Sequence, residues 1–450
     1  MEQVDVIIVG AGMAGLCAAV QASEQGATVA VFEKEAAIGG SSLLSGCFMA
    51  FAETDFQKQR GITDSVESLM NDLTTVGQSQ NEAALVEAYG AHQLETYEWL
   101  VSKGVTFHTC QAASGHSVPR GHTITPQQAI TTLYNEALAN GAKISLNHTV
   151  ERLLIEQQAV VGVVVEGQAY YANKGVILTT GGFSQSEELL HSFAPQLDQT
   201  IRLGGVGNKG DGIKLAAAAG AWLRDFPYIK GTYGFHPSST NEKKRQAHAF
   251  YKGGIIINSA GKRFINESVS YKLLGDAALA EQGATYQVFD QTVMEQSVAG
   301  DALYDFKLLY EEGLIQKADT LVQVSALTQA PPEAVAATIQ RYNDQLEDAR
   351  DAFGRTTLTH HFGTPHALQA PFYVMETVTA MLATYAGVSV NPKAQVLNPY
   401  GEPIAHLYAA GEVVGGFHGA GYMTGSSLGK AAIFGRVAAN ELLTVAQEVI

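Results

Sequence analysis

Residues 4–15 read Val-Asp-Val-Ile-Ile-Val-Gly-Ala-Gly-Met-Ala-Gly, and this stretch decides the fold. The apolar run at residues 4–9 is rich in β-branched side chains and predicts a buried parallel strand. Residues 16–25 predict a helix, and residues 28–32 predict a second strand that leads to Glu33. Strand, glycine turn, helix, strand and acid in this order are typical of a dinucleotide-binding unit. The sequence therefore predicts an α/β fold that binds a dinucleotide.

Each part of this unit has a physical role. Gly10 permits the tight turn, Gly12 lets the backbone approach a pyrophosphate, and Gly15 lets the helix pack closely on the strand. The N-terminus of the helix directs unpaired N–H groups at the phosphates. Glu33 can accept hydrogen bonds from the ribose hydroxyls. Together these roles favour dinucleotide binding over an ordinary glycine turn.

Length and composition exclude several other classes. A chain of 450 residues exceeds one ordinary core, so two domains are expected. The net charge of −16 argues against nucleic acid or an anionic membrane surface as a partner. No apolar stretch reaches about 18 residues, so no membrane span is expected. A first strand at Val4 leaves no room for a signal peptide, which favours a cytoplasmic location. Cys17, Cys47 and Cys110 are too few and too scattered for a metal site or a disulfide frame.

The run Gly-Lys-Arg-Phe-Ile-Asn-Glu at residues 261–267 resembles one found across the flavoproteins related to fumarate reductase and succinate dehydrogenase. The resemblance extends over almost the whole chain. It implies a Rossmann-like FAD-binding domain of the glutathione-reductase type, with an inserted α+β cap or catalytic domain. Residues 1–184 and 379–450 are expected to form the FAD-binding domain, and residues 185–378 the cap. The substrate is then expected where the two domains meet.

The same resemblance implies non-covalent FAD as the cofactor. Glycine-bearing segments at residues 39–42, 176–183 and 407–412 match those that close on FAD in this family. The helix expected at residues 427–445 would direct its positive N-terminus at the flavin pyrimidine ring. The positions that the resemblance assigns to FAD are Gly10, Gly12, Ala14, Gly15, Glu33, Lys34, Gly40, Ser41, Ser42, Gly46, Val150, Thr180, Gly181, Gly411, Glu412, Ser427 and Leu428.

Tyr271 is the first candidate for the chemistry. It stands eight positions after Arg263, where the soluble fumarate reductases carry the arginine that delivers a proton to the substrate. The 3-ketosteroid dehydrogenases of the family, which this site pattern resembles more closely, carry a tyrosine there that removes a proton next to a ketone. A phenol and the α-hydrogen of a ketone are both weak acids, so this transfer is plausible. The alternative is a tyrosine that only fills a packing position.

Tyr422 is the second candidate. Fumarate reductases hold an arginine at the matching place, which clamps a substrate carboxylate, and a tyrosine lacks that charged bidentate fork. In the ketosteroid dehydrogenases a tyrosine there donates to the ketone oxygen, helped by a backbone N–H four residues later. That N–H belongs to Ser426 here. Such donors stabilise an enolate. The alternative is that Tyr422 merely fills a glycine-rich loop.

Four further positions concern the substrate. Ala383 aligns with a carboxylate-binding histidine of the fumarate reductases, so three independent segments depart from the dicarboxylate pattern. His236 precedes a proline and resembles a histidine that binds the second carboxylate, although such a histidine can equally be a turn residue. We predict His236, Tyr385 and Gly425 to contact the substrate.

A small polar group is less easily assigned. His116, Arg120 and His122 lie in a glycine-bounded stretch, where flavin contact and a surface loop are both open and the surface loop is preferred. His418 is expected to have a structural role or to contact the flavin.

These features predict a flavin-dependent dehydrogenase that introduces a C=C bond next to the carbonyl of a steroid or a smaller cyclic ketone. Tyr271 would take the α-proton, Tyr422 and the Ser426 N–H would polarise the carbonyl, and the β-hydrogen would leave as hydride to flavin N5. Reversal gives an ene-reductase. The alternatives are a reductase of an unsaturated carboxylate and a non-catalytic flavoprotein. Without a haem attachment motif, an external electron acceptor or donor is expected.

Overall fold

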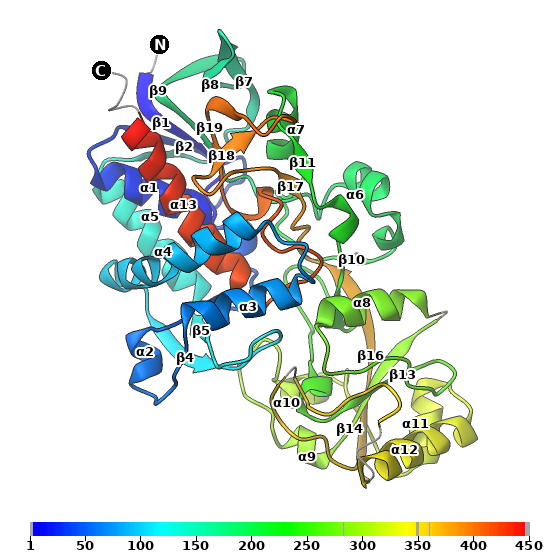
Figure 1. Cartoon of the computed structure of the whole chain (residues 1–450). Helices are drawn as coiled ribbons and strands as arrows, with labels where there is room; N and C mark the ends of the chain where they lie inside the picture. Colours follow the sequence, from blue (N-terminus) through cyan, green and yellow to red (C-terminus); the bar gives the residue numbers. More distant parts are fainter. Residues whose placement is uncertain (1–2, 282, 348–350, 360, 446–450) are drawn as a thin grey trace. The chain divides into compact units, whose positions relative to one another are not determined.

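The computed structural model describes residues 3–281, 283–347, 351–359 and 361–445. The chain divides into two compact units (Figure 1). Unit 1 contains Met1–Pro195, Gly204–Ile229 and Ala383–Ile450, and unit 2 contains Gln196–Leu203 and Lys230–Leu382. The chain thus passes into unit 2 twice, briefly at residues 196–203 and again at residues 230–382, and ends in unit 1.

Unit 1 is built on an eight-stranded sheet. Its parallel part follows the order β19, β9, β1, β2 and β6, so β9 lies between β1, from the start of the chain, and β19, from its last segment. The strands are β1 (Gln3–Val9), β2 (Val29–Phe32), β6 (Lys143–Ser145), β7 (Val150–Glu156), β8 (Ala159–Val165), β9 (Gln168–Leu178), β18 (Gln395–Leu397) and β19 (Pro403–Ala409). Residues 6–9 of β1 are buried, as their β-branched run predicts.

Helices α1 (Met13–Glu24), α4 (Ala83–Ser102), α5 (Pro126–Ala139) and α13 (Ser426–Val445) pack together beside this sheet (Figure 1). The approach of α13 to α1 is close. A Cβ built on Gly435 would lie 2.3 Å from the carbonyl oxygen of Ala14, which is too short for any side chain. The middle of α13 is therefore fixed against the first turn of α1.

A smaller layer completes unit 1. A three-stranded sheet, β3 (Phe48–Ala50), β5 (Gly121–Ile124) and β4 (Phe107–Gln111), lies with α2 (Asp55–Lys58) and α3 (Val66–Val76). The remaining elements of unit 1 are α6 (Glu187–Phe193), α7 (Asp211–Ala218), β11 (Leu223–Arg224) and β17 (Gly387–Val388).

Unit 2 has a sheet around β16 (Phe372–Met381), which pairs antiparallel with β12, β14 and β15 and parallel with β10. Apolar side chains of this sheet and of α11 and α12 form its main core. Its strands are β10 (Ile201–Arg202), β12 (Thr232–Phe235), β13 (Ile255–Asn258), β14 (Thr285–Asp290) and β15 (Gln316–Ala318). Its helices are α8 (Tyr271–Ala280), α9 (Gln291–Met294), α10 (Phe306–Glu311), α11 (Leu321–Thr328) and α12 (Pro332–Glu347).

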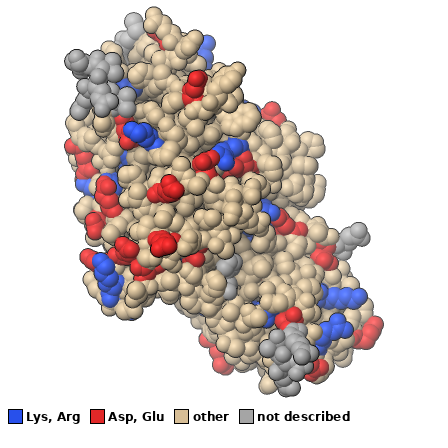
Figure 2. Space-filling model, in the orientation of Figure 1, with Lys and Arg blue, Asp and Glu red and all other residues tan. Residues whose placement is uncertain are grey.

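The predicted α/β class is confirmed by this architecture. One detail differs, because the first helix begins at Met13 rather than at residue 16. Its first turn lies inside the glycine motif, where Gly15 is already helical. No described helix is long and apolar enough to cross a membrane. On the face drawn in Figure 2, the described acidic and basic side chains are intermixed and form no single basic patch.

The Gly-Lys-Arg-Phe-Ile-Asn-Glu run supplies a buried ion cluster in unit 2. Glu267 is fully buried and accepts from Arg263 Nε at 2.8 Å and from Arg263 Nη2 at 2.6 Å. Arg355 Nη1 lies 3.4 Å from the same carboxylate, and the Ile256 N–H donates to it at 3.1 Å. The run therefore has a structural role: Glu267 pairs with both buried arginines, and Arg263 also pairs with the buried Asp351.

We expect Glu267→Gln to lower the free energy of unfolding by about 3–5 kcal/mol, because it removes the buried carboxylate that pairs with Arg355 and leaves Arg263 with Asp351 alone. Urea unfolding followed by fluorescence measures this. The control is Asp319→Asn, which breaks an exposed pair with Lys317 in the same unit and should change little. Equal stability of the two variants would contradict the expected role of the cluster.

Candidate active site

A narrow glycine turn joins β1 to α1. Gly10 has a φ of 107°, and a Cβ built there would lie 2.6 Å from the carbonyl oxygen of Thr179. A Cβ on Gly15 would lie 2.0 Å from the carbonyl oxygen of Gly10. Neither position admits a side chain, so the backbone comes as close to the sheet as a dinucleotide-binding turn requires.

The start of α1 lies against residues 39–42. Its N-cap residue, Gly12, carries no side chain that could cap the helix, and the N–H of Met13 donates to Ser42 Oγ at 3.1 Å. The first N–H groups of a helix attract anions. The bare cap at Gly12 and the Ser42 hydroxyl beside it offer donors that suit a phosphate group.

Glu33 ends the second strand at this turn. One carboxylate oxygen accepts the N–H of Ala11 at 2.8 Å, and the other accepts the N–H of Glu35 at 2.9 Å. The backbone N–H of His148 donates to the Glu33 carbonyl at 2.9 Å, which places the segment leading to Val150 beside the acid. Glu33 is therefore held at the turn, as its predicted contact with a ribose requires.

Asn208 connects two other predicted cofactor positions. Its Nδ2 lies 3.0 Å from Ser41 Oγ and 3.2 Å from Glu412 Oε2. The N–H of Thr384 donates to Glu412 Oε1 at 3.0 Å. A Cβ on Gly181 would lie 2.4 Å from Asn208 Oδ1, so this turn also needs glycine. Asn208 and Thr384 were not predicted from the sequence, because they stand far along the chain from the groups they bind.

The other predicted cofactor positions lie near these groups or at the ends of elements. Lys34 forms an ion pair with Asp211 at the start of α7. A Cβ on Gly411 would lie 3.0 Å from Ala14 Cβ, so the chain after β19 meets the first turn of α1. Gly40 begins a short 3-10 turn, Gly46 is exposed before β3, Thr180 follows β9, and Ser427 and Leu428 lie in the first turn of α13.

Lys430 is a buried cation that the sequence did not single out. Its Nζ donates to the Val414 carbonyl at 3.0 Å. Burial lowers the pKa of Lys430 to about 8, while the charges of Glu412 and Asp225 act in the opposite direction. The lysine therefore places a titratable positive charge near Glu412.

The site loop, residues 415–426, is anchored to the C-terminal end of α3. The N–H of Ala420 donates to the carbonyl of Gly77 at 3.0 Å. A Cβ on Gly421 would lie 2.1 Å from the carbonyl oxygen of Val76, so the loop backbone touches the helix end directly. This contact explains why the loop is rich in glycine.

Tyr422 lies in an aromatic cluster within unit 1. Its ring stacks on that of Tyr385, with centroids 4.9 Å apart and an interplanar angle of 7°, and the His418 ring lies 4.5 Å from Tyr385. The N–H of Gly425 donates to the Tyr422 hydroxyl oxygen at 3.3 Å. Burial raises the pKa of Tyr422, and the Gly425 hydrogen bond acts against this rise. The structure thus brings together Tyr385, Tyr422 and Gly425, three predicted site residues, with Tyr385 held at a φ of 55°.

Ser426 is the first residue of α13 and is fully buried. Its N–H donates to the Met423 carbonyl at 3.1 Å, and its hydroxyl donates to the same carbonyl at 2.7 Å. The N–H predicted to polarise a substrate carbonyl therefore already closes a turn. Its donation to a substrate stays a prediction.

Tyr271 lies in unit 2 as the first residue of α8. Its N-cap, Ser270, accepts the N–H of Lys272 at 3.3 Å, which fixes where the helix begins. The Tyr271 ring packs against an aromatic cluster, with its centroid 5.3 Å from that of His248. Burial lowers the pKa of His248 to about 3, so this imidazole is neutral beside the tyrosine.

His236 also lies in unit 2, directly after β12. Its Nδ1 accepts the N–H of Ser238 at 3.1 Å, so the neutral ring carries its proton on Nε2. Burial, and the charge of Arg245, lower the pKa of His236. This tautomer makes Nε2 a hydrogen-bond donor, which suits contact with a substrate oxygen.

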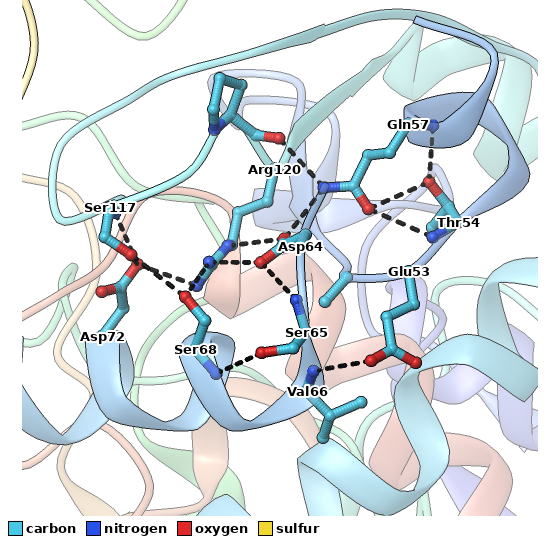
Figure 3. A network of polar contacts seen from close by, with 12 residues as sticks. Glu53, Thr54, Gln57, Asp64, Ser65, Val66, Ser68, Asp72, Ser117 and Arg120 are labelled. Atoms are coloured by element: carbon cyan, nitrogen blue, oxygen red, sulfur yellow. Dashed lines mark hydrogen bonds and ion pairs between the residues drawn. The ribbon is translucent and has the colours of Figure 1, made fainter. Parts of the chain in front are cut away.

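The preference for a surface loop at His116, Arg120 and His122 is wrong, because all three residues are fully buried. Arg120 forms a two-pronged ion pair with Asp64, at 2.7 and 3.1 Å, and donates to Asp72 at 2.8 Å (Figure 3). Polar side chains look like surface residues when their partners are unknown, and these partners lie some fifty residues earlier in the chain.

His122 belongs to the same buried layer. Its Nδ1–H donates to the Arg120 carbonyl at 2.9 Å, and its Nε2 accepts from Thr54 Oγ1 at 2.8 Å. Burial lowers the pKa of His122 to about 4, which keeps the ring neutral.

Comparison with known proteins agrees with this geometry. The sequence model described as "FAD binding domain" matches residues 5–428. The chain is 32% identical over 455 residues to a fumarate reductase (cytochrome) of Shewanella frigidimarina, covering 98% of this chain and 77% of that protein. It is 30% identical over 462 residues to a urocanate reductase of Eggerthella lenta, covering 97% of this chain and 74% of that protein.

A solved structure shows the same fold. It is the 3-ketosteroid-Δ4-(5α)-dehydrogenase of Rhodococcus jostii RHA1 in complex with 4-androstene-3,17-dione, with a TM-score of 0.81 and 23% identity. The match covers 98% of this chain and 97% of that one. The predicted fold class is confirmed over the full length of the chain.

We expect Glu33→Ala to weaken FAD binding by about 10- to 10²-fold, because hydrogen bonds to a charged group contribute about 1.5–3 kcal/mol. Titration of FAD into the apoprotein, followed by quenching of flavin fluorescence, gives the affinity. Glu156→Ala removes an exposed acid at the end of β7 and should leave it unchanged. An unaltered affinity in Glu33→Ala would remove Glu33 from the cofactor site.

Proposed function

The chain belongs to the family of FAD-binding flavoproteins that includes the fumarate reductases, and we propose that it oxidises or reduces a carbon–carbon bond next to a ketone. It is an FAD-dependent oxidoreductase that acts on C=C bonds. Bound FAD supplies the hydride chemistry of this class. The proposal concerns the substrate, and the partner that delivers or removes electrons is proposed to be an external carrier.

The arrangement of Tyr422 carries the proposal. Its hydroxyl oxygen accepts the Gly425 N–H at 3.3 Å at the start of a helix, which polarises the O–H and favours donation of its own proton. The ring is held by its stack on Tyr385. A neutral, rigid O–H donor matches the single oxygen of a ketone, whereas a carboxylate is bound best by a charged fork.

In the proposed reaction, Tyr422 donates a hydrogen bond to the ketone oxygen and stabilises the enolate that forms there. Tyr271 accepts the proton from the carbon α to the carbonyl. The β-carbon loses a hydride, for which bound FAD would be the acceptor, and a C=C bond is left between the two carbons. In the reverse direction Tyr271 returns the proton to the α-carbon. Tyr271 directly follows the N-cap residue Ser270 and is the first residue of α8, where a positive helix end would favour a tyrosinate.

A second candidate is a reductase of an unsaturated carboxylate. The relatives that favour it are named as reductases of fumarate and urocanate, and both match almost the whole chain. Under this alternative the donor Nε2–H of His236 would bind the carboxylate, and Tyr271 would supply the proton.

Anaerobic mixing separates the two candidates. Bleaching of the oxidised flavin is measured with cyclohexanone, 5α-androstane-3,17-dione, succinate and propionate. Reoxidation of the reduced flavin is measured with 2-cyclohexenone, 4-androstene-3,17-dione, fumarate, acrylate and urocanate. Turnover with the carbonyl compounds alone supports the ketone proposal, and turnover with the acids alone overturns it in favour of the second candidate.

Tyr271→Phe keeps the ring and removes the hydroxyl. We expect the rate of single-turnover flavin reduction to fall by about 10²- to 10⁴-fold, the usual range for a general acid or base. The control is Tyr251→Phe, which removes a hydroxyl bonded to the Val269 carbonyl in the same aromatic cluster and should react at nearly the parental rate. Parental activity in Tyr271→Phe would make Tyr271 a packing residue.

Tyr422→Phe should reduce the same rate constant by about 10- to 10³-fold, which is the cost of one lost oxyanion donor or somewhat less. Substrate affinity should change little, because charge on the oxygen develops only in the transition state. The concentration dependence of flavin reduction separates rate from affinity, and Tyr408→Phe on β19 serves as the control. A loss confined to affinity would exclude stabilisation of an enolate.

A further inference from the structure

We propose that His116 is a positioning residue for the site loop, which it holds so that the Tyr422 hydroxyl points at the substrate. The inference rests on the proposed role of Tyr422 and adds the group on which that role depends. His116 does not touch the substrate in this scheme and acts through the backbone of Thr424.

The contact between His116 and the site loop is direct. His116 is fully buried, and its Nε2 lies 2.7 Å from the Thr424 carbonyl oxygen. A carbonyl can only accept, so Nε2 carries the proton and donates. On the other side of the same residue, the N–H of Thr424 donates to the Ser114 carbonyl at 3.0 Å. Both backbone groups of Thr424 are therefore bound by the segment at residues 113–117.

These two hydrogen bonds to Thr424, called the clamp below, lie where the site loop leads into α13. Thr424 stands between Tyr422 and Gly425, and the Gly425 N–H is the group that donates to the Tyr422 hydroxyl. The Gly425 carbonyl accepts the Ala50 N–H at 3.1 Å. A shift at Thr424 would therefore alter both the N–H that polarises Tyr422 and the direction of its O–H.

The clamp is in turn held by the buried ion pairs of Arg120 with Asp64 and Asp72. The residue after His116 is Ser117, whose N–H and hydroxyl both donate to Asp72, at 2.6 and 2.9 Å. Asp72 belongs to α3 and also pairs with Arg120 (Figure 3). The C-terminal end of α3 receives the other side of the site loop through Gly77. The two supports of the loop are thus joined to each other.

The test compares His116→Leu with His116→Gln. Gln can place its Nε2–H near the position of the imidazole Nε2–H, whereas Leu fills space and donates nothing. We expect Leu to slow single-turnover flavin reduction by about 10- to 10²-fold, the size expected for a misplacement of about 1 Å, and Gln to restore most of the rate. The substrates are those of the compounds named under Proposed function that bleach the flavin. The affinity of the variants for these substrates should be unchanged.

A double-mutant cycle shows whether His116 acts through Tyr422. In a Tyr422→Phe background, His116→Leu should cost no more than about twofold, because the group it positions is already gone. The same loss in both backgrounds would overturn the proposal, as would a parental rate in His116→Leu alone. If Tyr422→Phe itself reacts at the parental rate, the proposed function fails. Hydrogen exchange then shows, without any substrate, whether His116 holds Thr424 in place.

Hydrogen–deuterium exchange needs no substrate. His116→Leu should speed exchange of the amides at residues 424–426, and His116→Gln should not, since the N–H of Thr424 is protected only while the clamp is closed. His122→Leu is the matched control, because it removes a buried histidine of the same layer that binds Thr54 and the Arg120 carbonyl instead. Equal exchange rates in His116→Leu and the parent would show that His116 does not hold Thr424. An equal rise in the exchange rate in His122→Leu would show the same.

Discussion

The buried pairing of Arg120 with Asp64 and Asp72 is the interaction on which the candidate site depends. Burying a guanidinium is costly unless its donors find acceptors, and here two carboxylates and the Ser68 hydroxyl accept four hydrogen bonds from Arg120. The pairing fixes the segment before β5 against α3. Both supports of the site loop therefore belong to one rigid assembly, which keeps the aromatic cluster around Tyr422 in place.

A second constraint is the close approach of backbones at the glycine turn. Gly10 and Gly15 let β1 and α1 come together, and Gly435 lets α13 approach α1 in the same way. The N-terminus of α1 is thereby placed at the glycine turn after β1. A positive helix end then lies where a pyrophosphate is expected, so the backbone itself supplies positive potential there.

The chemistry assigned to the site depends on neutral donors. Tyr422 and Tyr385 stack where relatives of the fumarate-reducing type are expected to carry a cation, and Tyr271 stands at the first turn of α8 next to a neutral histidine. A hydroxyl can donate to a ketone oxygen and exchange a proton with a carbon acid, but it binds a dicarboxylate poorly. Under the proposed function, substrate class is set by a few side chains on a fold that the family shares.

Residues 4–33 by themselves determined the strand, turn, helix and strand of the nucleotide site, because apolar periodicity and glycine spacing act over a few residues. The resemblance supplied the positions of Tyr271 and Tyr422. Only the tertiary structure decided that Arg120 is buried and that His116 binds Thr424, which lies 308 positions away. A polar residue is predicted to be exposed as long as its hydrogen-bond partner is unknown. Partners that folding brings together from distant parts of the chain leave no local pattern in the sequence.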